Sequence, residues 1–322
     1  MMSNDLIITP QSQLEVSEDS ISRFVNYYIN HLDIRKVSKI KYQNYLNQFL
    51  LWLKDRNIVY PTREHIIEFK QHLIEKELKE TTISSYLKAI KRLFEYLSKT
   101  NKYENIAFGV KQPLVNTGFK KLSLSVEEAK LLLFSIDRSD IVGKRDYAVI
   151  TLILHTGLRL IEVCRALKSD VKNEGENTLL YVQGKGHDAK DAFVVLTPSV
   201  LFAINEYLKY RDYNENSPLF ASHSLKTKKE TALSTTVLSN ILHARLKEAG
   251  FDNPKITPHS LRHTAITLAL LSGSSVQEAK EMARHTNINT TLIYAHNINR
   301  LSDNSPEKRI EEILNGRETP ED

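Results

Sequence analysis

Apolar residues recur every three or four positions in four successive stretches of the N-terminal third, and this spacing constrains the fold more than any other feature. The stretches are 21–29, 42–53, 66–74 and 83–97. Side chains at such intervals lie on one face of an α-helix. Four amphipathic helices this close together can bury their apolar faces against one another, so the pattern predicts a compact all-α domain.

The periodicity lapses between Asn101 and Leu124, where Gly109, Pro113 and Gly118 interrupt it. Glycine and proline in such a stretch mark a connection rather than a helix or strand. Because 322 residues exceed what one small core usually holds, we expect two domains. The predicted boundaries are a flexible tail over 1–17, an N-terminal domain over 18–103, a linker over 104–123 and a second domain over 124–322.

Signals for the start of a helix are frequent in the second domain. Ser125 and Glu128 have the spacing of a capping box. Three prolines each follow a polar residue that can cap a helix: Pro198, Pro258 and Pro306. Residues 178–183 and 192–196 are rich in β-forming side chains and predict a hairpin. The predicted fold class is therefore mainly α: an all-α N-terminal domain, then a mixed but mostly helical domain with a small β-sheet.

The composition excludes several classes of protein. Apolar residues make up 41% of the chain and charged residues 26%, as in soluble globular proteins. No apolar run approaches the roughly 20 residues that span a bilayer, and the N-terminus lacks a secretory pattern, so we expect a cytoplasmic protein with no membrane partner. The single cysteine, Cys164, excludes an internal disulfide and a cysteine-based zinc site.

Positive charge is concentrated in the N-terminal third. Residues 1–115 hold 17 Lys and Arg against 13 Asp and Glu, a net charge of +4, whereas residues 116–322 hold 27 against 26. Two basic groups stand out, Arg35, Lys36, Lys39 and Lys41 in one and Lys88, Lys91 and Arg92 in the other. Such groups suit phosphate contacts along a duplex, although lysines on exposed helix faces are usually just solvated.

Side chains with complementary chemistry are concentrated near the C-terminal end, and two more lie upstream. The six are Arg159, Lys185, His259, Arg262, His285 and Tyr294. A tyrosine hydroxyl can attack phosphorus, guanidiniums can bind non-bridging oxygens, imidazoles can exchange protons and a lysine can protonate a leaving oxygen. Together these residue types can cut and rejoin a phosphodiester without a metal ion.

Ordinary structural roles are also open to these residues. Arg159 and Glu162 are three apart and can form an ion pair on one helix. A lone histidine on a helix usually has a structural role. His259 and His263 have the spacing of a zinc-binding helix, but Ser260 stands where a metalloprotease needs its glutamate.

Four segments resemble the signature of the tyrosine recombinases, the group that includes the integrases and the Xer proteins. They are TGLRLIEV (156–163), QGKG (183–186), HSLRHT (259–264) and ARHTNINTTLIYAH (283–296). The resemblance is specific because several separated motifs agree in type, order and spacing. It covers roughly the last 200 residues closely and the preceding 100 loosely.

The resemblance implies a site-specific DNA recombinase and a role for each residue of the set. Tyr294 attacks the scissile phosphate and forms a 3′-phosphotyrosyl link. Arg159 and Arg262 hold the phosphate, and His259 or the phosphate itself takes the tyrosine proton. Lys185 donates a proton to the departing 5′ oxygen.

The chain departs from the family pattern at two places. The family usually has glycine directly before the second histidine, whereas here Arg284 precedes His285, the remaining member of the catalytic set. A bulkier residue at that position can shift His285. The family often has a basic residue after Lys185 at the start of the next strand, where this chain has Asp191 and Ala192.

The resemblance also implies partners and an assembly. The expected partner is double-stranded DNA with specific recombination sites, and no cofactor is needed. Strand exchange through a Holliday junction implies a homotetramer on two sites, with a SAM-like core-binding N-terminal domain. The C-terminal segment 307–314 is expected to dock on a neighbouring protomer or to pack within its own chain. Two other functions stay open: a type IB topoisomerase-like enzyme and a catalytically idle sequence-specific DNA-binding protein.

Overall fold

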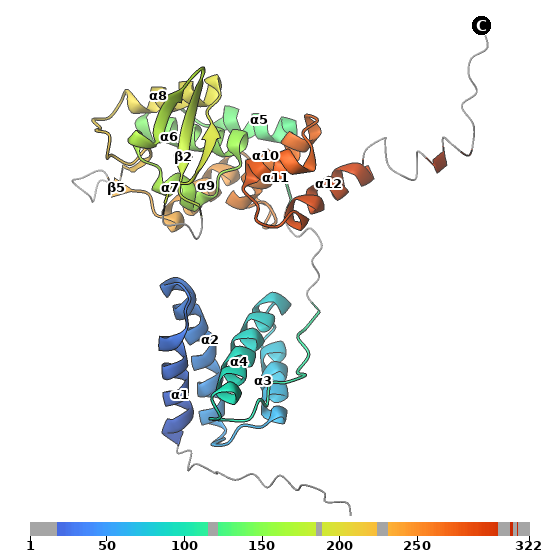
Figure 1. The fold of residues 1–322 in the computed structure, drawn as a ribbon. Helices are drawn as coiled ribbons and strands as arrows, with labels where there is room; N and C mark the ends of the chain where they lie inside the picture. The colour runs from blue at the N-terminus through green and yellow to red at the C-terminus, as the bar shows by residue number, and fades with distance from the viewer. Residues whose placement is uncertain are drawn as a thin grey trace, which may run out of the picture. The chain divides into compact units, whose positions relative to one another are not determined.

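The chain forms two compact units, Met1–Thr117 and Gly118–Asp322 (Figure 1). The computed structural model describes residues 18–114, 122–184, 189–223 and 231–301, together with Ile310, Glu311 and Leu314. The expected tail over 1–17 lies outside these residues, as do Lys185 and Pro306. In the part of the chain described, no helix is both long enough and apolar enough to cross a membrane.

Residues 18–114 of the first unit contain four helices, as the apolar periodicity predicts. They are α1 (Glu18–His31), α2 (Lys36–Asp55), α3 (Arg63–Glu75) and α4 (Glu80–Lys99). Their apolar faces meet in one core, in which Leu46, Phe49, Ile66 and Leu87 are fully buried. The aromatic residues of these helices are mostly packing residues within or beside that core.

Residues 104–112, assigned from the sequence to the start of the linker, pack on the first unit. Ala107 and Val110 are buried in its core. The hydroxyl of Tyr103 donates a hydrogen bond to the carbonyl of Pro61 at 2.9 Å. The first unit therefore extends beyond its last helix, because apolar side chains of an irregular segment are buried with the helices.

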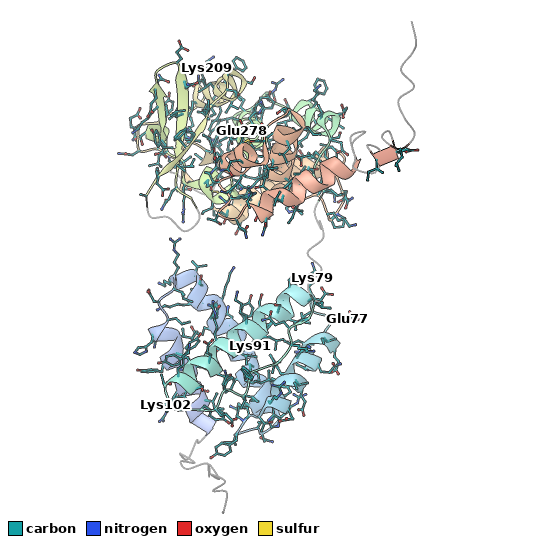
Figure 2. The ribbon with its side chains drawn as sticks, turned by 45° about the vertical axis from the view of Figure 1, so that its right-hand side comes forward. Glu77, Lys79, Lys91, Lys102, Lys209 and Glu278 are labelled. Carbon is teal, nitrogen blue, oxygen red and sulfur yellow. The ribbon has the colours of Figure 1, made fainter. Side chains whose placement is uncertain are left out.

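Both basic groups of the N-terminal third belong to this unit. The side chains of Lys36 and Lys88 are exposed, and that of Lys91, labelled in Figure 2, is partly exposed. Arg92 instead donates from Nη1 to the hydroxyl of Tyr42 at 2.7 Å. Arg92 therefore links α4 to α2, while Lys88 and Lys91 of the same basic group can still contact other molecules.

The second unit is mostly helical. Its helices are α5 (Val126–Ser135), α6 (Ile141–Thr156), α7 (Leu160–Arg165), α8 (Pro198–Leu208), α9 (Thr235–Glu248), α10 (Pro258–Leu271), α11 (Val276–Ala283) and α12 (Asn289–Leu301), with the short 3₁₀-helix η1 (Lys168–Asp170). Three of the four predicted start signals are confirmed, and the fourth, at Pro306, lies outside the described residues. Ser125 Oγ accepts a hydrogen bond from the Glu128 N–H at 3.1 Å, and proline is the first residue of both α8 and α10.

Three antiparallel strands form the main sheet, β1 (Val171–Glu174), β2 (Asn177–Val182) and β3 (Ala192–Val195), in the order β1-β2-β3. The pairing of Leu180 with Val194 confirms the predicted hairpin. Strand β1 adds to it, and its sequence VKNE has too few apolar residues to indicate a strand. A second sheet, β4 (Ala221–Ser222) with β5 (Thr231–Ala232), also adds to the prediction, because two-residue strands leave no periodicity.

Helix α6 is the centre of the second unit. It is buried along most of its length and contacts α5, α8, α9 and α10. Helices α10, α11 and α12 contact one another and form one group, coloured orange to red in Figure 1. The turn that ends α6 and the start of α10 are thus held by the same core, and this brings two distant sequence motifs together.

Candidate functional site

Arg159 is the N-cap residue of α7, directly after the turn that ends α6. Gly157 closes α6 with φ 61° and ψ 25°, a left-handed conformation that glycine adopts without steric cost. Arg159 donates from Nη1 to Glu162 Oε1 at 2.9 Å and from its backbone N–H to Glu162 Oε2 at 2.8 Å. The ion pair expected from the spacing is confirmed, and it orients the guanidinium at the end of a helix.

Arg262 lies on α10 and is 3% exposed. Its Nη1 donates to the carbonyl of Gly157 and its Nη2 to the carbonyl of Ala283. Burial lowers the pKa of Arg262 to about 9, and the positive charge of Arg159 acts in the same direction. A pKa of about 9 is still above neutral pH, so the guanidinium carries its charge.

The C-terminal end of α11 binds both of these guanidiniums. The carbonyl of Ala283 accepts from Arg262, and the carbonyl of Arg284 accepts from Arg159 Nη2 at 3.0 Å. The last carbonyls of a helix have no partner within the helix, so side chains that donate there fill an existing vacancy. Positive charge is also favoured at that end by the helix dipole.

Arg284 adds a third guanidinium to the same place. Its Nη2 donates to Glu162 Oε2 at 3.0 Å and its Nη1 to the carbonyl of Met282 at 2.8 Å. Burial raises the pKa of Glu162, but the charge of Arg284 and the hydrogen bonds from Arg159 outweigh it and hold the pKa below its usual value. Arg159 and Arg284 both pair with the Glu162 carboxylate, and Arg262 lies close enough for its pKa to be affected by that carboxylate. These four side chains therefore carry two positive charges in excess.

His285 follows Arg284 and is half-buried. Its Nδ1 lies 2.9 Å from the hydroxyl of Thr291, which is fully buried. Burial, together with the charges of Arg262 and Arg159, lowers the pKa of His285 to about 4. The imidazole is therefore neutral at neutral pH and retains a nitrogen that can accept a proton or a hydrogen bond.

Tyr294 lies on α12 with only 4% of its surface exposed. Its ring packs with Ile266 and Ala283, and its hydroxyl contacts Nδ1 of His263. Burial raises the pKa of Tyr294 to about 12, although the charge of Arg262 partly offsets this. In this arrangement the phenol keeps its proton and is a poor nucleophile.

His259 and His263 lie one turn apart on α10, with ring centroids 4.6 Å apart. His259 is exposed, whereas His263 is the histidine in contact with Tyr294. The charge of His259 also contributes to the lowered pKa of His285, so His259 belongs to the same site. Among the residues that the structure describes, no group of three or more His, Cys, Asp and Glu side chains could hold a metal ion.

Five of the six residues predicted from the sequence are brought together, and the sixth, Lys185, lies outside the described residues. The five are Arg159, Arg262, His259, His285 and Tyr294. Sequence reasoning missed the contacts of two further residues, His263 and Arg284. The four-residue spacing from His259 and the replacement of a family glycine were the signals that could have indicated them.

Lys190, just before β3, is bound to the carboxylate of Asp170. Lys190 donates from Nζ to Asp170 Oδ1 at 2.7 Å and also contacts Oδ2 of this mostly buried carboxylate. Asp170 Oδ2 accepts a further hydrogen bond from the N–H of Leu167 at 2.6 Å. The start of β3 is therefore tied to η1, close in the chain to α7 and Arg159.

Sequence comparison links both units to one group of proteins. Residues 123–300 match the Phage integrase family, and residues 21–101 match the Phage integrase N-terminal SAM-like domain. The tyrosine recombinase XerC of Caldanaerobacter subterraneus subsp. tengcongensis is 32% identical over 224 residues, which cover 68% of this chain and 58% of that protein. The TnP I resolvase of Bacillus thuringiensis is 30% identical over 265 residues, covering 79% of this chain and 87% of the resolvase.

The fold is shared with solved structures of lower sequence identity. The XerH site-specific recombinase, in a post-cleavage complex with a palindromic difH substrate, superposes with a TM-score of 0.69. Its sequence is 21% identical, and the match covers 93% of this chain and 85% of that one. At this identity the likeness supports the architecture of the chain.

Proposed function

The chain belongs to the phage integrase family and is a DNA strand-exchanging enzyme of the tyrosine recombinase type, and we propose that its active site contains the six residues predicted from the sequence. These residues are Arg159, Lys185, His259, Arg262, His285 and Tyr294. The observation that carries the proposal is the excess of two positive charges beside the buried tyrosine. A scissile phosphate supplies the negative charge that this group lacks. The comparisons favour strand exchange over a type IB topoisomerase-like reaction or idle DNA binding.

In the proposed reaction the Tyr294 oxygen forms a bond to phosphorus while the bond from phosphorus to the 5′ oxygen breaks. His259 or the phosphate takes the phenolic proton, and Lys185 donates a proton to the departing 5′ oxygen. A 5′ hydroxyl from the partner duplex then attacks the phosphotyrosine. The bond from phosphorus to the Tyr294 oxygen breaks as the new bond forms, and the phenol regains the proton that the hydroxyl loses, so the bond energy is retained. Neither ATP nor a metal ion takes part.

The guanidiniums of Arg159 and Arg262 act on the transition state. Negative charge increases on the equatorial oxygens of phosphorus during in-line attack, and a guanidinium fork binds two such oxygens at once. Loss of one such donor typically lowers the rate by about 10² to 10³. The neutral His285 adds a hydrogen bond to the same anion without another charge.

The tyrosine hydroxyl must leave His263 before it can reach a phosphate. The Tyr294 hydroxyl contacts His263, and burial raises its pKa to about 12, which keeps it protonated in the free protein. When the hydroxyl approaches a phosphate held by Arg262, the positive charge of Arg262 lowers the pKa of the phenol, and the phosphate or His259 can accept its proton. Cleavage would then start only when DNA occupies the site.

The proposal assigns a part to each region of the chain. Residues 18–103, together with the packed segment 104–112, form the core-binding domain that contacts duplex DNA through its basic groups, and residues 124–322 form the catalytic domain. Four protomers act on two specific DNA sites, in the cytoplasm. Ile310 and Leu314, which are 55% and 78% exposed, support docking of the C-terminal segment on a neighbouring protomer.

A nicked duplex that traps the covalent intermediate tests the chemistry. The substrate carries the recombination site of this protein, recovered by selection of bound duplexes, with a nick that lets the cleaved end diffuse away. We expect wild type to form a covalent adduct that resists denaturation, and Tyr294→Phe to bind the duplex but form none. The adduct should form equally well in EDTA. Loss of cleavage on chelation would overturn the metal-independent mechanism.

Strand exchange separates the recombinase from its alternatives. Two duplexes of different length should yield recombinant strands with wild type, whereas a topoisomerase would relax a supercoiled circle without a partner duplex. An adduct that persists in Tyr294→Phe would overturn the assignment of the nucleophile. Resolution of chromosome dimers and integration or excision of a mobile element both use this chemistry.

A further inference from the structure

Arg284 combines a backbone conformation unfavourable for arginine with a side chain that is mostly buried. It ends α11 with φ 52° and ψ 47°, the left-handed region in which residues other than glycine are uncommon. The family resemblance described above implies glycine at this position. The arginine side chain is nonetheless only 14% exposed and makes two hydrogen bonds. The contacts of the Arg284 side chain must offset the free-energy cost of its left-handed backbone conformation, so these contacts indicate its role.

The contacts of Arg284 converge on Arg159 by two routes. The carbonyl of Arg284 accepts from Arg159 Nη2 at 3.0 Å. Its guanidinium binds Oε2 of Glu162, while Arg159 Nη1 binds Oε1 of the same carboxylate at 2.9 Å. Glu162 is fully buried, so solvent cannot replace either partner. Because Arg284 binds Oε2 of Glu162, the Arg159 guanidinium binds Oε1. Arg284 therefore helps to fix the position of the Arg159 guanidinium.

The same contacts determine the net positive charge that Arg159 and its neighbours present to an anionic ligand. A buried carboxylate paired with Arg159 alone would neutralise it, since opposite charges in contact cancel at a distance. In this chain Glu162 is shared with Arg284, so the pair of arginines retains one positive charge beside Arg262. Without Arg284 the group of Arg159, Arg262 and Glu162 would keep one excess charge in place of two.

We propose that Arg284 is a positioning residue for the strand-cleavage reaction, acting through Glu162 to hold Arg159 in place and to preserve its charge for the scissile phosphate. This inference rests on the function proposed above. The role assigned to Arg284 requires no contact with the phosphate, because its guanidinium acts on Arg159 through the carboxylate of Glu162. Capping of α11 would need only the bond to Met282, whereas the bond to Glu162 reaches α7, 122 residues earlier.

Three substitutions separate the charge of Arg284 from its volume and backbone. Arg284→Met keeps a long side chain and removes the charge, Arg284→Lys keeps the charge, and Arg284→Gly removes the side chain but suits the left-handed backbone. Cleavage is followed as single-turnover adduct formation on the nicked duplex at saturating protein. We expect the Met and Gly variants to cleave at least about tenfold more slowly, less than for direct loss of a phosphate donor. The Lys variant should recover most of the rate, and all should bind the duplex within about threefold of wild type.

A substrate with an altered phosphate distinguishes positioning from a structural defect. In a methylphosphonate duplex a methyl group replaces one non-bridging oxygen at the scissile position, which removes the charge that Arg159 balances. On this substrate the ratio of the wild-type cleavage rate to the Arg284→Met rate should be smaller, because a neutral phosphonate needs less positive charge around it in the transition state. A misfolded or loosely packed site would lose the same factor on both substrates. The double variant Arg159→Lys with Arg284→Met should cleave about as slowly as Arg159→Lys alone, since both changes act on one guanidinium.

Each outcome has a defined meaning. Cleavage of the phosphodiester by Arg284→Met at the wild-type rate would overturn the inference, and so would an equal loss on both substrates. If Arg284→Met fails to melt cooperatively, the cleavage rates of Arg284→Gly and Arg284→Lys are compared instead. Arg284→Gly suits the left-handed backbone, and Arg284→Lys keeps the charge. Formation of a Tyr294 adduct by wild type keeps the proposed function intact in all these cases. Absence of that adduct would remove the proposed function itself.

Discussion

Burial moves the pKa values of Tyr294 and His285 in opposite directions, and both shifts favour the uncharged form. The pKa of Tyr294 rises to about 12, so its hydroxyl stays protonated, while the pKa of His285 falls to about 4, so its ring stays neutral. The three arginines keep the charge. The free site thus combines fixed cations with neutral groups able to exchange protons, which suits an anionic ligand.

The lowered pKa of His285 predicts a pH-dependent contribution to stability. Its folded value of about 4 lies below the unfolded value of about 6.5, so between these values the unfolded chain binds more protons. Stability present above about pH 6.5 is then lost as the pH falls towards 4. Thermal melts at about pH 7.5 and pH 5 should show a larger fall in Tm for wild type than for His285→Gln. Parallel falls in the two proteins would contradict this assignment, since the titrating carboxylates are common to both.

At the scale of elements, the ends of α6, α7 and α11 organise the site more than the bodies of these helices do. Arg159 starts α7, Gly157 ends α6, and the last carbonyls of α11 bind two guanidiniums. A helix end offers unpaired backbone groups in fixed directions, so it can hold a side chain in one orientation. Small residues such as Ala279 and Ala283 are fully buried where α11 packs, which brings these carbonyls close to α10.

Gly157 tests whether the turn after α6 matters for chemistry as well as stability. Gly157→Ala places a side chain in the left-handed region, which costs about 1–2 kcal/mol and lowers Tm by roughly 2–8 °C. The added Cβ would lie 3.4 Å from Cε of Met282, an ordinary contact, so the cost is mainly conformational. Because the Gly157 carbonyl accepts from Arg262, we also expect slower adduct formation on the nicked duplex.

Gly175 supplies the matched control for this substitution. Its φ of 60° is close to the 61° of Gly157, and nothing lies within 4 Å of an added Cβ. Gly175→Ala should therefore lose a similar amount of stability while cleaving as wild type does. Equal rates in the two variants at matched stability would show that the Gly157 turn does not position Arg262.

At the scale of the whole molecule, each unit has a core of its own. Among the described residues of the first unit, twenty buried apolar residues form one cluster, and separate clusters lie in the second unit. Residues 103–112 complete the first core. A domain with its own core folds alone in the usual case, so each unit is expected to unfold as an independent cooperative transition.

Calorimetry of fragments tests this independence. A fragment of residues 18–114 and one of residues 122–322 should each melt cooperatively, and their transitions should reappear in the full chain. A first fragment ending at residue 103 serves as the comparison. It should melt at a lower temperature, because it lacks the buried side chains of Ala107 and Val110. A fragment of residues 18–114 without a cooperative transition would contradict the assignment of an autonomous core.

Features that depend on neighbouring residues could be read from the sequence. Apolar periodicity predicted α1 to α4, capping residues and prolines predicted the starts of α5, α8 and α10, and the spacing of Arg159 and Glu162 predicted their ion pair. These features follow from interactions over three or four positions. The order of the motifs indicated the family for the same reason, since it is a property of the chain alone.

Only the tertiary structure decided which side chains meet. It placed His263 rather than His259 against Tyr294, joined Arg284 to Glu162 across 122 positions, and buried Ala107 and Val110 with the first core. Such contacts join segments far apart in the sequence, and local pattern does not encode their geometry. Residue types along the chain therefore determined the available chemistry, whereas packing between distant segments determined the charge, burial and neighbours of each group.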